Sequence, residues 1–318
     1  RDGVFINEQY SFASQSITDF HQDDTISSLA INEKNNRLYY SRHLSQEHIT
    51  VRSLASGQVK RQLASSSRDM FGQFIADSQQ VLFLSNRSGG WELWVNQEAG
   101  SEQLTHQQGI VGVPATAPVG NQYVLPIKPK DANSYSLYLG EIGAKSPTKI
   151  SSIKGDVRNP SFSNDGAKIY YSSNLEGNWG IYLYDLASQQ SQFIVGHGAK
   201  YAVEDENGGL YYSRDNQAGI FYHSDDGSED IEVTSELSSG DWGSFFYQNG
   251  VLYFVKRTDT NDQVVAVTAK GEQLVFSLPA LSIRGQRALA KADNDTVVIS
   301  MLGINDADIY SVSLAASH

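Results

Sequence analysis

A pair of apolar triplets recurs along the whole chain at nearly constant spacing. The downstream triplets begin 44, 44, 44, 39, 44 and 45 residues apart, at positions 49–51, 93–95, 137–139, 181–183, 220–222, 264–266 and 309–311. An upstream triplet precedes each of them, at positions 38–40, 82–84, 124–126, 169–171, 210–212, 252–254 and 297–299. Repeats of about 40–45 residues made of short strands are typical of β-propellers. The sequence therefore predicts an all-β, seven-bladed β-propeller of four-stranded blades.

The repeats predict a single propeller domain over residues 1–318. The seven repeats start near residues 24, 68, 110, 156, 197, 240 and 284. The fourth shows its four strands, named A to D, most clearly, near residues 160–163, 168–173, 180–185 and 192–195. The Asp165-Gly166 turn between strands A and B is a strong hairpin signal, because glycine adopts positive φ without strain. No segment of about ten residues has a helical period.

The two ends of the chain predict how the ring closes. The last repeat has strands at 287–292, 296–301 and 308–313, but its outer strand is missing. Residues 1–22 precede the first repeat and contain strand-like segments at 4–6 and 10–12. We expect this N-terminal strand to complete the last blade, which leaves no interior edge unpaired. A disordered leader is the alternative.

Composition excludes several classes of function. The chain has 24 Lys and Arg against 36 Asp and Glu, a net charge of −12, and nucleic-acid binding by this domain is not expected because it requires clustered basic residues. The absence of cysteine excludes disulfides and thiolate chemistry. No stretch approaches the ~18 apolar residues of a membrane span. Membrane attachment is expected only through a segment outside this chain.

Two segments resemble a known repeat family. Residues 85–94, SNRSGGWELW, are similar to the SNR-x-G-x-x-x-I-Y core of the TolB-type propeller repeat. Residues 162–166 and 169–174 resemble its fuller F-S-P-D-G and I-Y-F-S-S-N form, with Asn164 in place of the proline. TolB itself carries an α/β domain ahead of a six-bladed propeller, so the resemblance is to the repeat class. It implies a TolB-like periplasmic binding protein.

A third segment, residues 304–312, is similar to the ending of propellers attached to CadC- or ToxR-like regulators. In that family a winged-helix DNA-binding domain and a membrane span precede an external sensor. The resemblance implies a periplasmic or extracytoplasmic sensor domain, membrane-anchored in its full-length form, in signal transduction and transcription regulation. The start at Arg1, which is neither an initiator Met nor a signal peptide, fits this expectation.

Catalytic motifs are absent from the sequence. There is no Gly-x-Ser-x-Gly elbow, Walker A loop, His-Glu-x-x-His or EF-hand loop. His43 and His48 are expected in one loop, at a spacing that matches no standard metal motif. We therefore predict a non-catalytic domain without cofactor or metal. The alternative is a propeller enzyme of the oligogalacturonate-lyase type, with a metal at the channel mouth near His21 or His197.

The loops from strand D to the next strand A rim one face of a propeller beside its channel. They carry polar and charged residues that we predict to bind a protein partner or a small ligand: Arg68, Asp69, Arg158, Asn159, His197, Lys200, Asp241, Trp242, Arg284 and Arg287. The alternative is that these residues join the blades, with Arg–Asp pairs tying adjacent loops, because loops at propeller faces are always polar.

Overall fold

The computed structural model describes residues 5–7, 14–16, 24–63, 65–98, 100–106, 109–175, 177–227, 230–293 and 295–313. Within these ranges every regular element is a β-strand except the 3₁₀ turn η1 (Ser239–Asp241). No helix in this part of the chain is long and apolar enough to cross a membrane.

Five antiparallel sheets follow one another along the chain, each with its strands in sequence order. The first two contain β6 (Asp69–Phe74), β7 (Val81–Ser85), β8 (Glu92–Gln97) and β9 (Gly100–Gln103), then β10 (Gly109–Val111), β11 (Ala115–Thr116), β12 (Gln122–Pro129), β13 (Ser136–Glu141) and β14 (Thr148–Lys149). The third contains β15 (Val157–Phe162), β16 (Lys168–Ser173), β17 (Gly180–Asp185) and β18 (Gln190–Val195). The last two contain β19 (Ala199–Glu204), β20 (Leu210–Arg214), β21 (Gln217–His223) and β22 (Asp230–Thr234), then β23 (Phe245–Gln248), β24 (Val251–Arg257), β25 (Asn261–Thr268) and β26 (Gly271–Pro279).

The sixth sheet joins the two ends of the chain. Its order is β27-β28-β4-β3, and β5 also pairs with β4. These strands are β27 (Leu289–Lys291), β28 (Thr296–Ser313), β4 (Arg37–Ser53), β3 (Asp24–Asn32) and β5 (Val59–Leu63). β28 and β4 pair along their whole length, from Thr296↔Ser53 to Ser313↔Arg37. A strand from the start of the chain thus lies between β28 and β5.

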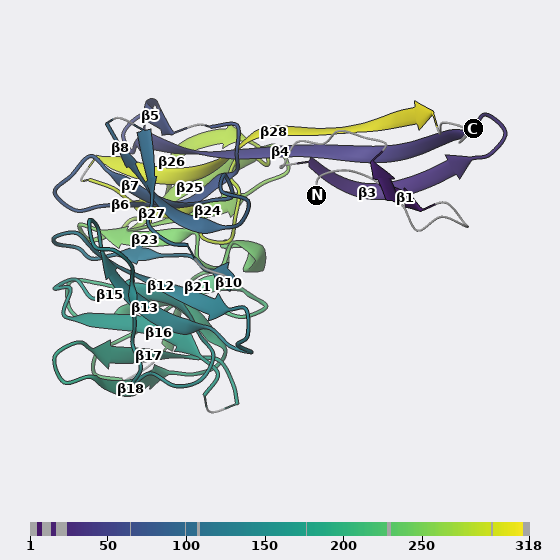
Figure 1. The fold of residues 1–318 in the computed structure, drawn as a ribbon. Coiled ribbons are helices and arrows are strands. Elements are labelled where there is room, and N and C mark those ends of the chain that lie inside the picture. Colours follow the sequence, from purple (N-terminus) through teal and green to yellow (C-terminus); the bar gives the residue numbers. More distant parts are fainter. Residues whose placement is uncertain are drawn as a thin grey trace.

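The sixth sheet also forms an arm. The far halves of β28 and β4, together with β3, extend away from the stacked sheets (Figure 1). In the arm Tyr40 and Tyr310 stack with their ring centroids 5.7 Å apart. Leu29 and Ile31 on β3 remain 58% and 61% exposed, so this part of the sheet lacks the double-sided burial of the body.

Besides the two-stranded sheet of β1 (Phe5–Asn7) and β2 (Ser14–Ser16), the described residues form six sheets of four or five strands, and the seven blades predicted are not confirmed. The triplets at 38–40 and 309–311 predict strands of two blades, yet they pair with each other in the arm. His43 and His48 are predicted in one loop but lie in β4, and residues 302–307, between the predicted strands 296–301 and 308–313, belong to β28. An apolar triplet predicts a strand, but it does not predict the sheet to which that strand belongs. In the structure, one sheet contains parts of both the first and the last repeat.

The strand that pairs with the last repeat also differs from the predicted one. β1 (Phe5–Asn7) pairs with β2 (Ser14–Ser16), and the strand that pairs with β28 is β4. The rest of residues 1–22, including Val4 and the segment 10–12, lies outside the described residues. For the fourth repeat, strands B and C are confirmed at 168–173 and 180–185, because the turns on both sides fix their ends.

One strand of each sheet lies innermost, and these six inner strands contact one another in turn. The contacts run from β6 to β11, β15, β19, β23, β27 and back to β6. Apolar side chains of neighbouring sheets pack between them; for example, Tyr170 and Ile181 of the third sheet share a cluster with Leu210 and Tyr212 of the fourth. The inner strands therefore surround one axis, and their side chains line whatever space remains along it.

Candidate functional site: two hollows on one axis

The inner strands line two hollows in succession. The first, here called the entrance hollow, has a volume of about 220 Å³ and takes a residue from each of the six sheets or the loop leading into it: Phe71, Val113, Arg158, Lys200, Trp242 and Gln286. The second, the axial cavity, has a volume of about 180 Å³ and takes residues slightly further along each strand: Gln73, Thr116, Ser161, Tyr201, Phe245 and Lys291. The same six strands thus build both hollows along one axis.

A β-bulge near the start of the inner strands separates the residues of the two hollows. The register shifts between Arg158 and Ser161 on β15, and between Met70 and Gln73 on β6. Asn159 and Phe71 lie within these bulges with φ of 53° and 58°. Such bulges bend a strand and redirect a side chain. Here they allow one short strand to face the entrance hollow and then the axial cavity.

Arg158 forms one wall of the entrance hollow. Its guanidinium lies over the rings of Tyr135 and Trp179, 4.8 and 5.4 Å from their centroids. Asp156 accepts from Arg158 Nη2 at 2.7 Å. The aromatic rings hold the guanidinium plane in one orientation, and the carboxylate balances its charge.

Lys200 and Trp242 form the opposite wall. Lys200 Nζ lies 4.9 Å from the centroid of the Trp242 ring and 2.5 Å from Asp215 Oδ1. Trp242 is only 6% exposed, so this residue, predicted on the rim of one face, is buried. Asn159 Nδ2 donates to Lys200 O at 2.9 Å, which ties the two walls together. Four of the predicted residues, Arg158, Asn159, Lys200 and Trp242, thus meet in this hollow.

Three other predicted residues join strands through ion pairs. Arg68 Nε lies 2.6 Å from the buried Glu47, which ties β4 of the sixth sheet to the first sheet. Asp69 is 1% exposed and pairs with Arg87 at 2.7 Å. Asp241 is 7% exposed and pairs with Arg257 at 2.6 Å. Of these three pairs, only that of Arg68 joins two sheets, whereas the pairs of Asp69 and Asp241 lie within the first and the fifth sheet.

The remaining residues are dispersed. His197 is exposed with φ of 57°, and Arg284 is half-buried with its backbone N–H donated to Ser300 O; neither lines the two hollows. His43 and His48 both belong to β4 rather than to a loop, because their backbone pairs with β28. Among the described side chains no three His, Cys, Asp or Glu form a group that could hold a metal ion. His21 lies outside the described residues.

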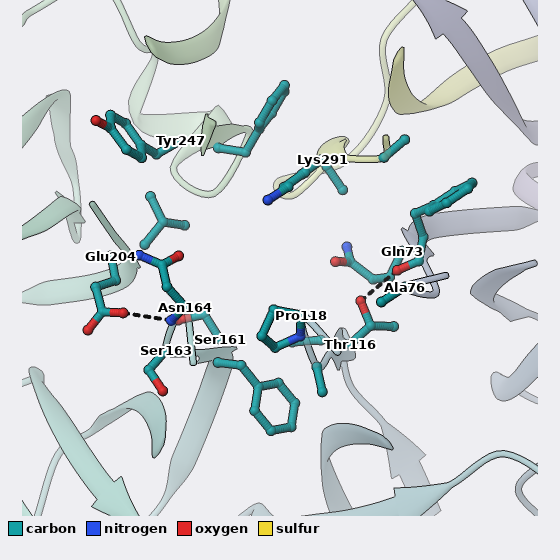
Figure 2. Close-up of a pocket in the computed structure, with 18 of the residues that line it drawn as sticks. Gln73, Ala76, Thr116, Pro118, Ser161, Ser163, Asn164, Glu204, Tyr247 and Lys291 are labelled. Atoms are coloured by element: carbon teal, nitrogen blue, oxygen red, sulfur yellow. Dashed lines mark hydrogen bonds between the residues drawn. The ribbon is translucent and has the colours of Figure 1, made fainter. Parts of the chain in front are cut away.

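Four further residues of the axial cavity are not predicted from the sequence. Figure 2 shows Asn164, Glu204, Tyr247 and Lys291 around it, with the Lys291 ammonium directed inward. Glu204 accepts from Tyr170 Oη at 2.7 Å and from Asn164 N at 2.6 Å. Burial, and then this bond to Glu204, raises the pKa of Tyr170. Their position in the repeat could have identified these residues, because they end strand A or follow it. The prediction considers only the loops that lead from strand D to the next strand A.

Arg287, the last predicted residue, lies inside the axial cavity rather than on a face. It is 2% exposed, and its guanidinium carbon lies 4.2 Å from the centroid of the Tyr201 ring. A Cβ at Gly243 would clash with Arg287 Cγ, so only glycine there leaves room for the arginine stem. The next residue back, Gln286, lines the entrance hollow. Two consecutive residues, Gln286 and Arg287, thus line the entrance hollow and the axial cavity respectively.

Comparison with known proteins identifies the fold. No protein-family model matches the chain. No curated protein matches its sequence. A structure assigned as TolB, from Agrobacterium tumefaciens, superimposes with a TM-score of 0.62 at 17% identity, over 82% of this chain and 99% of that one. TolB from Acinetobacter baumannii gives a TM-score of 0.58 at 11% identity, over 82% of this chain and 64% of that one, so the chain spans under two thirds of that protein.

The fold is not confined to TolB proteins. A chain of a nidogen–laminin complex gives a TM-score of 0.54 at 8% identity, over 73% of this chain and 93% of that one. None of these three structures supports the resemblance to CadC- or ToxR-like regulators, and the segment behind it, 304–312, is the arm half of β28. At these identities the likeness concerns architecture alone. The chain has the all-β fold of TolB-type propellers.

Proposed function

We propose that this protein is a non-catalytic, extracytoplasmic binding domain that recognises a protein partner through the entrance hollow. One observation carries the proposal: six sheets surround a single concave space, and Arg158, Asn159, Lys200 and Trp242 of three of them lie around it. Propellers of this fold offer the loop-built face at the end of the axis as a rigid surface. The extracytoplasmic location in this proposal rests on the resemblance to TolB-type propellers.

The lining of the hollow suits a side chain or chain end of a partner. Phe71, Val113 and Trp242 provide apolar contact, while Arg158 and Lys200 stand at its walls. Anchor pockets in protein interfaces combine an apolar floor with a few polar groups that fix orientation. Both cations already have carboxylate neighbours, Asp156 and Asp215, so hydrogen bonding and shape would select the partner more than net charge.

A site-specific cross-linking experiment tests this proposal. A photoreactive benzoylphenylalanine replaces Gln286, which is exposed and lines the hollow, or Leu274, which is 58% exposed on β26 away from it. In extracts of the source organism we expect one protein to cross-link from position 286 and not from 274. The yield should fall when Lys200→Ala or Arg158→Ala is added. Equal cross-linking from both positions, or a yield insensitive to the two substitutions, would contradict a partner site in the hollow.

A further inference from the structure

Arg287 is a buried cation without a carboxylate partner among the described residues. It is 2% exposed, and its Nη1 is buried without a hydrogen bond in this part of the chain. Its guanidinium lies instead against the ring of Tyr201. Other arginines of the chain differ: Arg158, Arg87 and Arg257 each have a carboxylate at 2.6–2.7 Å.

An unpaired guanidinium in the interior is costly. Transferring an ion out of water carries a large desolvation penalty, and buried charges in proteins are therefore paired or bound to a counter-ion. The arginine stem packs against Gly243, in the space that a Cβ would take, and the guanidinium lies against Tyr201 within the axial cavity. The missing partner of Arg287 must therefore come to it within the axial cavity.

The cavity around Arg287 defines the chemistry of that partner. Its volume of about 180 Å³ is well above the ~15 Å³ that one water needs. Phe74, Phe245 and Ala290 make part of its wall apolar, and Ser161 and Thr116 add hydroxyl groups. A guanidinium binds a carboxylate through two parallel hydrogen bonds. A small organic acid fits both the guanidinium and the apolar wall: its carboxylate would bind Arg287, and its carbon chain would contact the aromatic rings.

A second cation lines the same cavity. Lys291 ends β27, four residues beyond Arg287, and it lines the same cavity. Its ammonium points into the cavity (Figure 2), and no described carboxylate pairs with it. We propose that the axial cavity is a binding site for a small organic carboxylate, held by Arg287 with Lys291 as a second cation of the same cavity. The inference is independent of the proposed partner site in the entrance hollow.

Thermal unfolding in defined salts tests the proposal. The intact protein is melted in sodium acetate, propionate or succinate, each compared with sodium chloride at equal ionic strength. A ligand that binds only the folded state raises Tm with its concentration. We expect a saturable rise with the carboxylates beyond that with chloride, and isothermal titration should give one molecule per chain. A rise with chloride equal to that with the carboxylates would overturn the assignment.

Substitutions of Arg287 test whether the carboxylates raise Tm by binding at this residue. Arg287→Met keeps the volume and removes the charge; it should melt cooperatively, at or above the wild-type Tm in chloride, and lose the carboxylate response. Arg37→Gln removes an equal charge on the arm and should keep the response. If Arg287→Met does not fold, Arg287→Lys replaces it in the test. We expect Arg287→Lys to bind the carboxylate at least tenfold more weakly than the wild-type protein does. A carboxylate response that survives substitution at position 287 would overturn the site, whatever the cross-linking from position 286 shows.

Discussion

Arg257 lies between two buried carboxylates. Its guanidinium contacts Asp241 at 2.6 Å and Asp262 at 2.7 Å, and these residues are 7% and 1% exposed. Removing one partner of a buried pair leaves an uncompensated charge, a loss of about 3–5 kcal/mol. We therefore expect Arg257→Ala to reduce the free energy of unfolding in urea by about that amount.

The matched control for this prediction is Arg158→Ala. Arg158 is 46% exposed in its side chain and pairs with Asp156 at the surface. Exposed pairs contribute at most about 1 kcal/mol. If the two variants lost equal stability, Asp241 would not be the structural residue that its burial indicates, and its prediction as a binding residue would regain support.

His48 gives the sixth sheet a pH dependence. Burial first, and then the charge of Arg52, lowers the pKa of His48 below its usual 6.5, while Asp69 acts in the opposite direction. Between the folded and unfolded pKa values the unfolded chain binds more protons, so stability rises with pH across that window. We expect Tm to fall as pH decreases below about 6.5, and the fall to be smaller in His48→Gln. An identical pH profile of Tm in both proteins would contradict this assignment.

At the scale of elements, β4 and β28 each serve two structures. Their near halves, with Val51 opposite Val298, are strands of the body, and their far halves, with Tyr40 opposite Tyr310, form the arm. The near halves also pack on β6 of the first sheet. The contact between the first sheet and the sheet that joins the chain ends therefore rests on a few side chains.

Gly72 on β6 lies at that contact. A Cβ there would meet Val298 Cγ1 at 2.6 Å and Ile49 Cγ2 at 2.9 Å. Overpacking of this kind typically costs about 1–3 kcal/mol. We expect Gly72→Ala to lower the free energy of unfolding by that order. Gly90→Ala, whose Cβ would meet nothing within 4 Å, should leave it unchanged or slightly higher. Equal stability of the two variants would show that β6 does not pack closely on β4 and β28.

The whole molecule shows which features can be predicted from sequence. Strand positions such as 168–173 follow from apolar triplets flanked by turns, because these signals are local. The sheet containing β4 and β28 depends on pairing between residues far apart in sequence, for which the triplets carry no register. The site follows the same division: Arg158 and Lys200 are predicted from loop position, whereas the burial of Asp69 and the lack of a hydrogen bond at Arg287 Nη1 depend on contacts that loop position does not specify.

The central claim is that the start and end of the chain share one sheet, so that six inner strands surround the axis. Leu54 N donates to Asp295 O, which makes Ser53 and Thr296 the closely spaced, non-hydrogen-bonded pair next to it. Such pairs have Cα atoms about 4.5 Å apart, within the range of a disulfide. Both residues are small and buried, and the chain has no other cysteine to compete with a pair introduced there.

The most direct measurement is therefore oxidation of the double variant Ser53→Cys/Thr296→Cys, followed by mass mapping of the cross-link. We predict a disulfide in the folded protein that raises Tm and is lost on reduction. The control pair Ser53→Cys/Ser191→Cys, with Ser191 exposed on β18 of the third sheet, should not cross-link within one chain. If the two cysteines introduced at positions 53 and 296 stay reduced in the folded protein, or link no better than the control pair, the two ends do not share a sheet and the six-sheet arrangement is wrong.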